Sequence, residues 1–296
     1  WATASVAAAS AISGFEVYYT TTAVSQNLSL LTGSSIVSFA NDGTATSGVT
    51  KAGAGLTALT LSKTANNTGT ISVAYATDTA SDSINVTARG KTQTALTLNN
   101  NETITVDSSA GTSAITTLNA SDLTSLVVTG DEALTIGTLA GNAAMTSVDA
   151  SGSTGAVSIA ATANGALVGG TYTAGSGGLT AVAAAYADVM TGGAGADNFD
   201  GAAGNDSLVG GAGADTLDGG TGSDTILGGD GADQITIDTG IDSVSGGAGN
   251  DTIILGANLT AADAIDGGDG TDTATYTTAT GANVPTLTSV EILSTT

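Results

Sequence analysis

Aspartate recurs at every ninth residue across residues 192–254, behind a glycine-rich stretch and just ahead of a large apolar residue. Carboxylate oxygens are the ligands that hard divalent cations prefer. No lysine or arginine occurs in residues 92–296 to pair with these aspartates. These aspartates could therefore bind cations through regularly spaced oxygens, provided that the fold brings successive repeats into register.

Residues 192–254 divide into seven consecutive nonads with no insertion or deletion. Each nonad has glycine at position 4, aspartate at position 6 and a large apolar residue at position 8. The nonads read GGAGADNFD, GAAGNDSLV, GGAGADTLD, GGTGSDTIL, GGDGADQIT, IDTGIDSVS and GGAGNDTII. Upstream, residues 183–191 fit the same phase without the glycines, and we expect them to form a capping coil. Downstream, we interpret residues 255–266 as a 12-residue interruption before one more unit at 267–275.

A nine-residue period with one apolar position is too short for a helical repeat, and it predicts six residues of turn followed by three of strand. Glycine suits the turn because a tightly curled backbone visits positive φ. Two nonads would form one 18-residue coil, and stacked coils would form two parallel sheets around a narrow core. Nonads n and n+2 then lie one strand spacing apart, about 4.8 Å. The aspartates would form two columns. The first holds Asp197, Asp215, Asp233 and Asp251, and the second holds Asp188, Asp206, Asp224 and Asp242.

Carboxylates at that separation repel one another, so a cation is expected between the coils. Ca²⁺ accepts 6–8 oxygens from carboxylates and carbonyls, whereas Mg²⁺ demands a stricter octahedron. The absence of histidine and cysteine disfavours transition metals. Residues 183–275 contain 16 aspartates and no base, and about six to eight Ca²⁺ ions would come close to neutralising them.

The nonads closely resemble the repeat-in-toxin (RTX) family, whose repeat is GGxGxDxUx, with U a large apolar residue. The resemblance implies a calcium-loaded β-roll, export through a type I secretion channel and folding where external Ca²⁺ is plentiful. It carries the ligand role onto the position-6 aspartates, with Asp188 at the start of its column. The candidate metal ligands are Asp188, Asp197, Asp206, Asp215, Asp224, Asp233, Asp242, Asp251 and Asp272.

Two turns depart from the family pattern. Residues 201–206 have Ala202 in place of the second glycine, and residues 237–242 have lost both leading glycines. Sites that use these turns are expected to be weaker or incomplete. Asp230, Asp238 and Asp269 stand at position 2 or 3 and are interpreted as rim charge rather than as ligands.

The rest of the chain is also expected to be all-β. Residues 1–95 carry short runs of β-prone residues between glycine, asparagine and aspartate. Residues 96–182 repeat tetrads such as ITTL and MTSV at irregular spacing, which favours solenoid-like stacking, although a threonine-rich β protein could produce such tetrads by chance. We therefore predict four segments: an all-β segment (1–95), an irregular β-solenoid-like segment (96–182), the β-roll (183–275) and a closing strand (276–296).

Composition excludes several classes of function. The net charge of −23 repels nucleic acid and anionic membranes, and no apolar run reaches transmembrane length. Without histidine there is no Ser-His-Asp triad and no histidine-ligated zinc site. No GxSxG motif occurs. We expect a protein that is not an enzyme.

A Thr/Ala/Ser/Gly-rich β region joined to an RTX roll resembles the RTX-type surface-layer proteins. The resemblance implies a secreted structural protein on the bacterial cell surface, which uses Ca²⁺ to fold and to assemble into a lattice. Expected partners are further copies of the chain and a cell-surface glycan or lipopolysaccharide. Two alternatives stay open, namely a segment of a large RTX adhesin and the secretion and folding domain of an RTX enzyme. One internal match, ISGFEVYYTT (12–21) with LTSVEILSTT (287–296), aligns Glu16 with Glu291 and indicates a modular parent chain.

Overall fold

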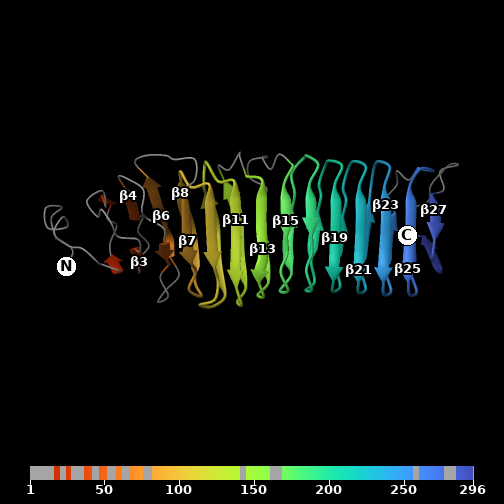
Figure 1. Cartoon of the computed structure of the whole chain (residues 1–296), viewed down its shortest axis with the longest axis horizontal. Helices are drawn as coiled ribbons and strands as arrows, with labels where there is room; N and C mark the ends of the chain where they lie inside the picture. Colours follow the sequence, from red (N-terminus) through yellow and green to blue (C-terminus); the bar gives the residue numbers. More distant parts are fainter. Residues whose placement is uncertain are drawn as a thin grey trace. The chain divides into compact units, whose positions relative to one another are not determined.

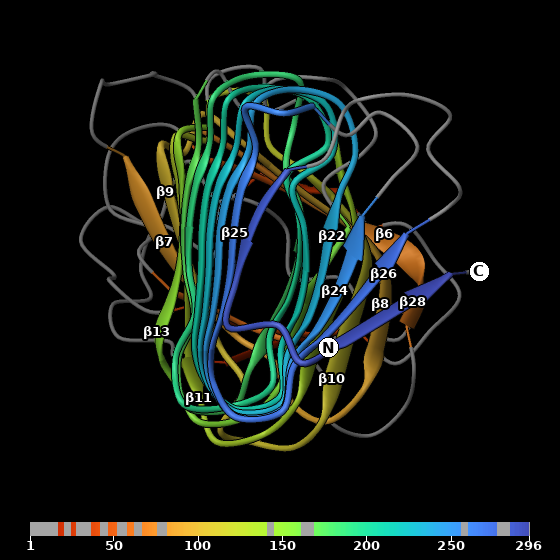
Figure 2. The same ribbon diagram turned by 90° about the vertical axis from the view of Figure 1, so that its right-hand side faces the viewer.

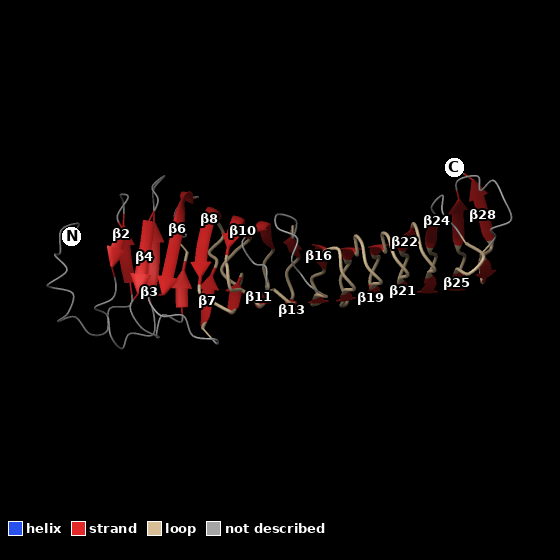
Figure 3. Ribbon diagram, turned by 90° about the horizontal axis from the view of Figure 1, so that it is seen from above, coloured by secondary structure: helices blue, strands red, loops and turns tan. Residues whose placement is uncertain are grey.

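The computed structural model describes eleven stretches of the chain. These are residues 17–20, 25–27, 37–41, 47–51, 58–61, 67–75, 82–140, 145–160, 169–255, 260–276 and 285–295. The described residues form 28 β-strands and no helix (Figure 3). Within these stretches, nothing helical is long and apolar enough to span a membrane. The chain divides into two compact units, Trp1–Met145 and Thr146–Thr296.

In the first unit, alternate strands pair in parallel to form two sheets, in the orders β1-β3-β5-β7-β9-β11 and β2-β4-β6-β8-β10-β12 (Figure 1). The strands of the first sheet are β1 (Val17–Thr20), β3 (Val37–Asn41), β5 (Ala58–Thr60), β7 (Ser83–Thr87), β9 (Thr103–Asp107) and β11 (Ser125–Gly130). Those of the second are β2 (Ser25–Asn27), β4 (Ser47–Lys51), β6 (Asn67–Tyr75), β8 (Thr92–Asn99), β10 (Ser113–Asn119) and β12 (Leu134–Ala140). The prediction of an all-β fold is confirmed for this unit, and the solenoid-like stacking that the sequence indicated from residue 96 onwards extends back to β1.

The second unit repeats the arrangement, with the orders β13-β15-β17-β19-β21-β23-β25-β27 and β14-β16-β18-β20-β22-β24-β26-β28. The first sheet holds β13 (Ser147–Ser153), β15 (Thr171–Thr173), β17 (Val189–Thr191), β19 (Ser207–Ala212), β21 (Thr225–Asp230), β23 (Ser243–Ala248), β25 (Ala264–Asp269) and β27 (Thr286–Thr288). The second holds β14 (Val157–Ile159), β16 (Leu179–Val182), β18 (Asn198–Asp200), β20 (Thr216–Asp218), β22 (Gln234–Ile237), β24 (Thr252–Leu255), β26 (Thr273–Tyr276) and β28 (Ile292–Thr295).

The first unit has wide coils with a well-filled interior. Ser83 pairs with Thr103 and Thr103 with Ser125, so coils repeat at 20 and 22 residues. Strands of this length alternate inward and outward over several residues. Two or three apolar side chains per strand are therefore buried in the longest strands. Those of β8, β10 and β12 are Leu96, Leu98, Ile115, Leu118, Leu134, Ile136 and Leu139.

The second unit has narrower coils with a thin core. Leu208 pairs with Ile226, and Phe199 pairs with Leu217, both 18 residues on, which confirms the predicted stacking of nonads n and n+2. The two sheets face each other across this core when viewed along the coil axis (Figure 2). Every position-8 side chain of the seven nonads is at most 4% exposed. In most of these short strands the position-8 residue is the one large apolar side chain that points into the core.

Close stacking of the turns explains the constant glycine at position 4. Gly231 has φ +146°, a conformation that side chains with a Cβ rarely adopt. A Cβ on Gly231 would also collide with the carbonyl oxygen of Gly213, one coil earlier. Both constraints apply at position 4 of the six turns from Gly204 to Gly249, so the spacing of these coils depends on glycine there.

Two sequence interpretations are wrong in their detail. Residues 183–191 were expected to cap the roll, but β17 pairs with both β15 and β19 and so lies within the stack. Residues 255–266 were expected to interrupt it, but β25 pairs with β23 from Ala264 onwards, 21 residues after Ser243. In the sequence, residues 258–266 thus fit a degenerate nonad with Asp263 at position 6, three residues out of phase with the seven nonads before it. The prediction failed because this nonad has no glycine.

The boundary between the two compact units, at 145–146, lies inside the segment predicted at 96–182. The fourfold division of the chain stays a prediction. Glu16, which the internal match aligns with Glu291, lies outside the described residues.

Candidate metal centre

All nine candidate ligands lie in two columns along the turns of the second unit. Each carboxylate immediately precedes a short strand, two residues before its inward apolar side chain, so it also points inward. The nine aspartates are at most 3% exposed. The structure therefore brings together, and buries, every residue that the repeat singled out.

A ladder of hydrogen bonds runs along each column. The backbone N–H of Asp197 donates to Asp215 Oδ1 at 2.7 Å, and that of Asp215 donates to Asp233 Oδ1 at 2.8 Å. In the other column, Asp188 N–H donates to Asp206 Oδ1 at 2.7 Å. Each bond joins one coil to the next, which places successive carboxyl groups one strand spacing apart.

The second oxygen of most of these carboxylates has no partner. Buried Oδ2 atoms without a hydrogen bond belong to Asp188, Asp206, Asp215, Asp224, Asp233, Asp251 and Asp272. A buried carboxylate oxygen without a partner costs several kcal/mol of free energy, roughly 3–5 where a partner has been removed. Seven such oxygens in one short segment are the arrangement expected of a site that binds cations rather than of chance.

Main-chain oxygens converge on the same places as these free carboxylate oxygens. A Cβ on Gly201 would lie 2.7 Å from both Asp206 Oδ2 and Gly219 O, which come from successive coils. Around Gly210, the carboxylate of Asp215 and the carbonyl of Gly228 approach in the same way. The absent side chain of the position-1 glycine thus leaves a cradle lined by a carboxylate and a carbonyl oxygen. A hard dication with oxygen ligands fits this donor set.

The carboxylates alone would not complete such a site. Within the described ranges, no group of three or more acidic, histidine or cysteine side chains is placed to hold an ion. Successive carboxylates of one column lie one strand spacing apart, so at most two neighbouring carboxylates can reach the same ion. The remaining ligands must therefore be main-chain carbonyl oxygens, which the glycine turns supply.

Burial raises the pKa values of most of the aspartates in the columns. Loss of hydration raises the pKa of Asp188, Asp215 and Asp224 to about 6, although the backbone N–H donors act in the opposite direction. Neighbouring carboxylates raise these pKa values further. Burial likewise raises the pKa of the other column members Asp197, Asp206, Asp233, Asp242 and Asp251.

The two degenerate turns differ from each other. Ala202 adopts φ +63°, close to the +76° of Gly220 in the next coil, so this turn keeps its shape at the cost of backbone strain. At residues 237–242, Ile237 replaces the position-1 glycine and its side chain is buried. A Cβ on Gly219 would first meet Asp224 Oδ2 at 2.7 Å and the Ile226 side chain at 3.1 Å, whereas beside Gly201 and Gly210 a carbonyl oxygen of the next coil is among the nearest atoms. The second turn therefore forms the less complete site, in line with its sequence.

Sequence reasoning missed one aspartate of the columns. Asp263 Oδ1 accepts the backbone N–H of Asp242 at 3.1 Å, so Asp263 extends the second column by one coil. The triplet Asp263-Ala264-Ile265 follows the pattern of aspartate, any residue and apolar residue found in every nonad. Continuing the nonads with a three-residue gap after residue 254 would have placed Asp263 at position 6. Asp230, Asp238 and Asp269 are exposed, as rim charge should be.

In the absence of divalent cations, we predict that lowering the pH stabilises the second unit. The raised pKa values mean that the folded chain binds protons more tightly than the unfolded chain, whose aspartates titrate near 3.9. The stabilising contribution is therefore present below that value and is lost as the pH rises through about 6. Thermal melting in chelator should give a Tm roughly 5 °C or more higher at pH 5 than at pH 7.5. A Tm that falls on acidification would contradict the assignment.

Comparison with known proteins agrees with this geometry. A model of the RTX calcium-binding nonapeptide repeat matches four times, at residues 175–208, 200–235, 209–244 and 236–258. No curated protein and no solved structure matches the chain. Repeats of this family bind Ca²⁺ and have a structural role in RTX proteins, which are typically secreted. Residues 175–258 of this chain are RTX calcium-binding nonapeptide repeats.

Proposed function

We propose that the chain is a calcium-dependent structural protein of a secreted bacterial surface layer, in which Ca²⁺ drives folding of the roll and assembly of a lattice. The observation that carries this proposal is the pair of columns of buried carboxylate oxygens without partners. Among the described residues, every buried carboxylate belongs to one of these columns. This distribution of buried carboxylates supports cation binding along the stack.

The ligands would be the nine candidate aspartates together with the main-chain carbonyls of the glycine turns. Bound Ca²⁺ supplies positive charge that offsets the buried carboxylates and links successive coils. Metal binding then contributes directly to folding free energy, because the unfolded chain does not hold the site together. About six to eight ions would occupy the two columns. A chain that folds only on meeting external Ca²⁺ is also suited to export through a type I channel.

Assembly into a lattice is supported by the surface of the roll. Leu227 on β21 and Val189 on β17 are large apolar side chains that point outward, 41% and 46% exposed. Asp230, Asp238 and Asp269 are exposed in the turns, and no base lies beyond Lys91. Two such acidic faces repel each other unless cations lie between them. Shared Ca²⁺ and apolar contact would together hold copies side by side.

Asp215→Asn tests the ion-binding part of the proposal. The amide can still accept the hydrogen bond from Asp197 N–H, but the substitution removes the charge that faces the cradle beside Gly210. We expect the Ca²⁺ midpoint for folding, followed by circular dichroism, to rise roughly tenfold. Without Ca²⁺ the variant should be at least as stable as the parent, since one buried charge has gone.

Asp269→Asn is the matched control, because it removes the same charge from an exposed position three residues before Asp272. Its Ca²⁺ midpoint should stay within about twofold of the parent. Equal effects of the two substitutions would show that general surface charge, rather than the column, governs calcium binding.

Electron microscopy of the purified protein tests the surface-layer part. With millimolar Ca²⁺ the protein should form ordered two-dimensional sheets, and chelation should disperse them. A protein that folds with Ca²⁺ but stays monomeric would contradict lattice assembly. That result would favour a segment of an adhesin, recognised by glycan or surface binding, or the folding domain of an RTX enzyme.

A further inference from the structure

The last coil departs from the nonad pattern and lies beyond the residues that match the family. Asp266 pairs with Thr288, and Thr273 pairs with Ile292. Six residues of one coil, 267–272, therefore face only three of the next, Ser289, Val290 and Glu291. This short turn contains neither glycine nor aspartate, so the repeat pattern alone assigns it no ligand.

Glu291 nevertheless occupies the place of the next aspartate in the first column. Asp272 N–H donates to Glu291 Oε2 at 2.8 Å, just as Asp251 N–H donates to Asp272 Oδ1 at 2.8 Å. Ile292 N–H donates back to the carbonyl of Asp272 at 3.0 Å, as at the start of each preceding strand. The extra methylene of glutamate gives the reach that a three-residue turn needs. The ladder of the column thus continues past the last aspartate.

The same turn also supplies a carbonyl oxygen. A Cβ on Gly267 would lie 2.7 Å from Asp272 Oδ2 and would collide with the carbonyl oxygen of Ser289. One coil earlier, the corresponding space beside Gly246 is bordered by Asp251 Oδ2 and the carbonyl of Gly267. Ser289, at φ +50°, therefore presents its carbonyl where glycine does in the inner turns. Asp272 is 0% exposed and its Oδ2 has no hydrogen-bond partner.

The other column ends differently. Both carboxylate oxygens of Asp263 are hydrogen-bonded within its own turn, since Thr260 N–H donates to Oδ2 at 2.7 Å and Thr260 Oγ1 donates to Oδ1 at 3.0 Å. A polar side chain thus satisfies the end of that column. At the end of the first column Asp272 Oδ2 has no hydrogen-bond partner, and the carboxylate of Glu291 accepts the backbone N–H of the same residue.

We infer that a further Ca²⁺ ion is held between the turn 267–272 and the turn 289–291, with ligands from Asp272 Oδ2, the Ser289 carbonyl and the Glu291 carboxylate. This inference rests on the proposed calcium binding of the roll and extends it to a turn without the repeat. Glu291 is exposed, which leaves the ion a path from solvent. The site closes the column and ties the final strand to it.

The final strand needs such a tie. In β28, Ile292 and Leu293 are 46% and 57% exposed, so apolar burial contributes little to holding the strand in place. Figure 2 shows β28 at the C-terminal end of the stack of described strands. The described contacts of β28 include its pairing with β26, the hydrogen bond between the Thr275 and Ser294 hydroxyls at 2.9 Å, and the link through Glu291.

Glu291→Gln tests the inference in the full chain. The Gln amide oxygen can still accept Asp272 N–H, so a purely structural role would survive. We expect the Ca²⁺ count in equilibrium dialysis to fall by one ion per chain, with the other ions retained. Amide exchange of β28 in saturating Ca²⁺ should accelerate at least tenfold. Glu291→Asp, which keeps the charge but shortens the reach, should lose the same ion.

Glu102→Gln is the matched control, because Glu102 Oε2 likewise accepts the N–H of a residue in the preceding coil, Asp82, at 2.6 Å, in a unit without aspartate columns. The control should keep the full Ca²⁺ count. An unchanged count and unchanged β28 exchange in Glu291→Gln would overturn the inference while leaving the calcium roll intact. A parent chain that binds no Ca²⁺ would instead overturn the proposed function itself.

Discussion

Repulsion between stacked, buried carboxylates is the constraint on which the second unit depends. Neighbouring members of a column are joined by hydrogen bonds from one coil to the next, so they cannot move apart without breaking the ladder. No lysine or arginine follows Lys91 to offset them. The glycine turns, which let carbonyl oxygens approach the free carboxylate oxygens, make sense as the other half of a cation site. The nine-residue period, the high glycine content and the negative charge thus follow from one requirement, the binding of cations between stacked carboxylates.

The two units show two ways to stabilise a parallel coil. In the first, long strands such as β10 bury Ile115 and Leu118, so apolar packing holds neighbouring coils together. In the second, three-residue strands such as β18 and β20 bury one apolar side chain each, Phe199 and Leu217. A core this thin leaves much of the cohesion to the turns. The unit with the thinner core is also the one whose turns carry the carboxylate columns.

The nonads made the roll predictable because each position has one physical role. The stacking of nonad n on nonad n+2, both columns and the inward position 8 could all be derived from the period.

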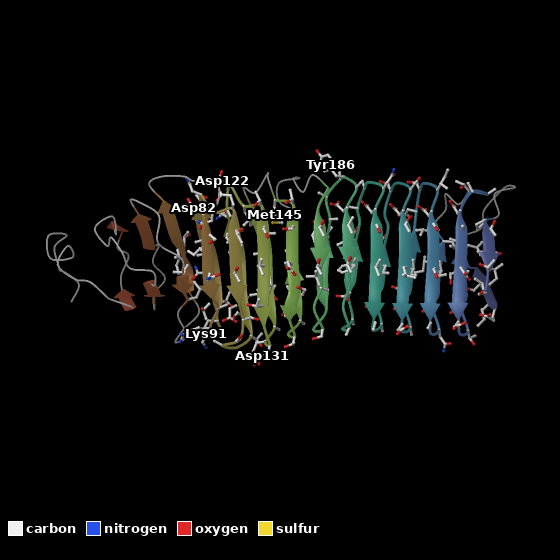
Figure 4. The ribbon with its side chains drawn as sticks, in the orientation of Figure 1. Asp82, Lys91, Asp122, Asp131, Met145 and Tyr186 are labelled. Carbon is white, nitrogen blue, oxygen red and sulfur yellow. The ribbon has the colours of Figure 1, made fainter. Side chains whose placement is uncertain are left out.

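The sequence predictions failed where tertiary pairing outweighed the local pattern. Residues 258–266 contain no glycine, so the glycine pattern did not reveal this repeat. The Asp263 carboxylate accepts a hydrogen bond from Thr260 N–H instead of facing a glycine cradle. Glu291 was noticed only as part of an internal match, because its role depends on a turn shortened by three residues. The positions of Tyr186 and Ala202 could not be predicted from the repeat either. Tyr186 projects from the edge of the turns, 45% exposed, while its carbonyl packs against Gly204 (Figure 4).

Hydrogen exchange of the intact chain with and without Ca²⁺ tests the central claim most directly. In chelator at pH 7.5, amides from β17 to β26 should lose most of their protection, and Ca²⁺ should restore it reversibly. Amides of β8, β10 and β12, whose coils are held by apolar packing, should keep theirs. Protection of β17 to β26 that is indifferent to chelation would show that the carboxylate columns are stable without a cation, and would contradict the account.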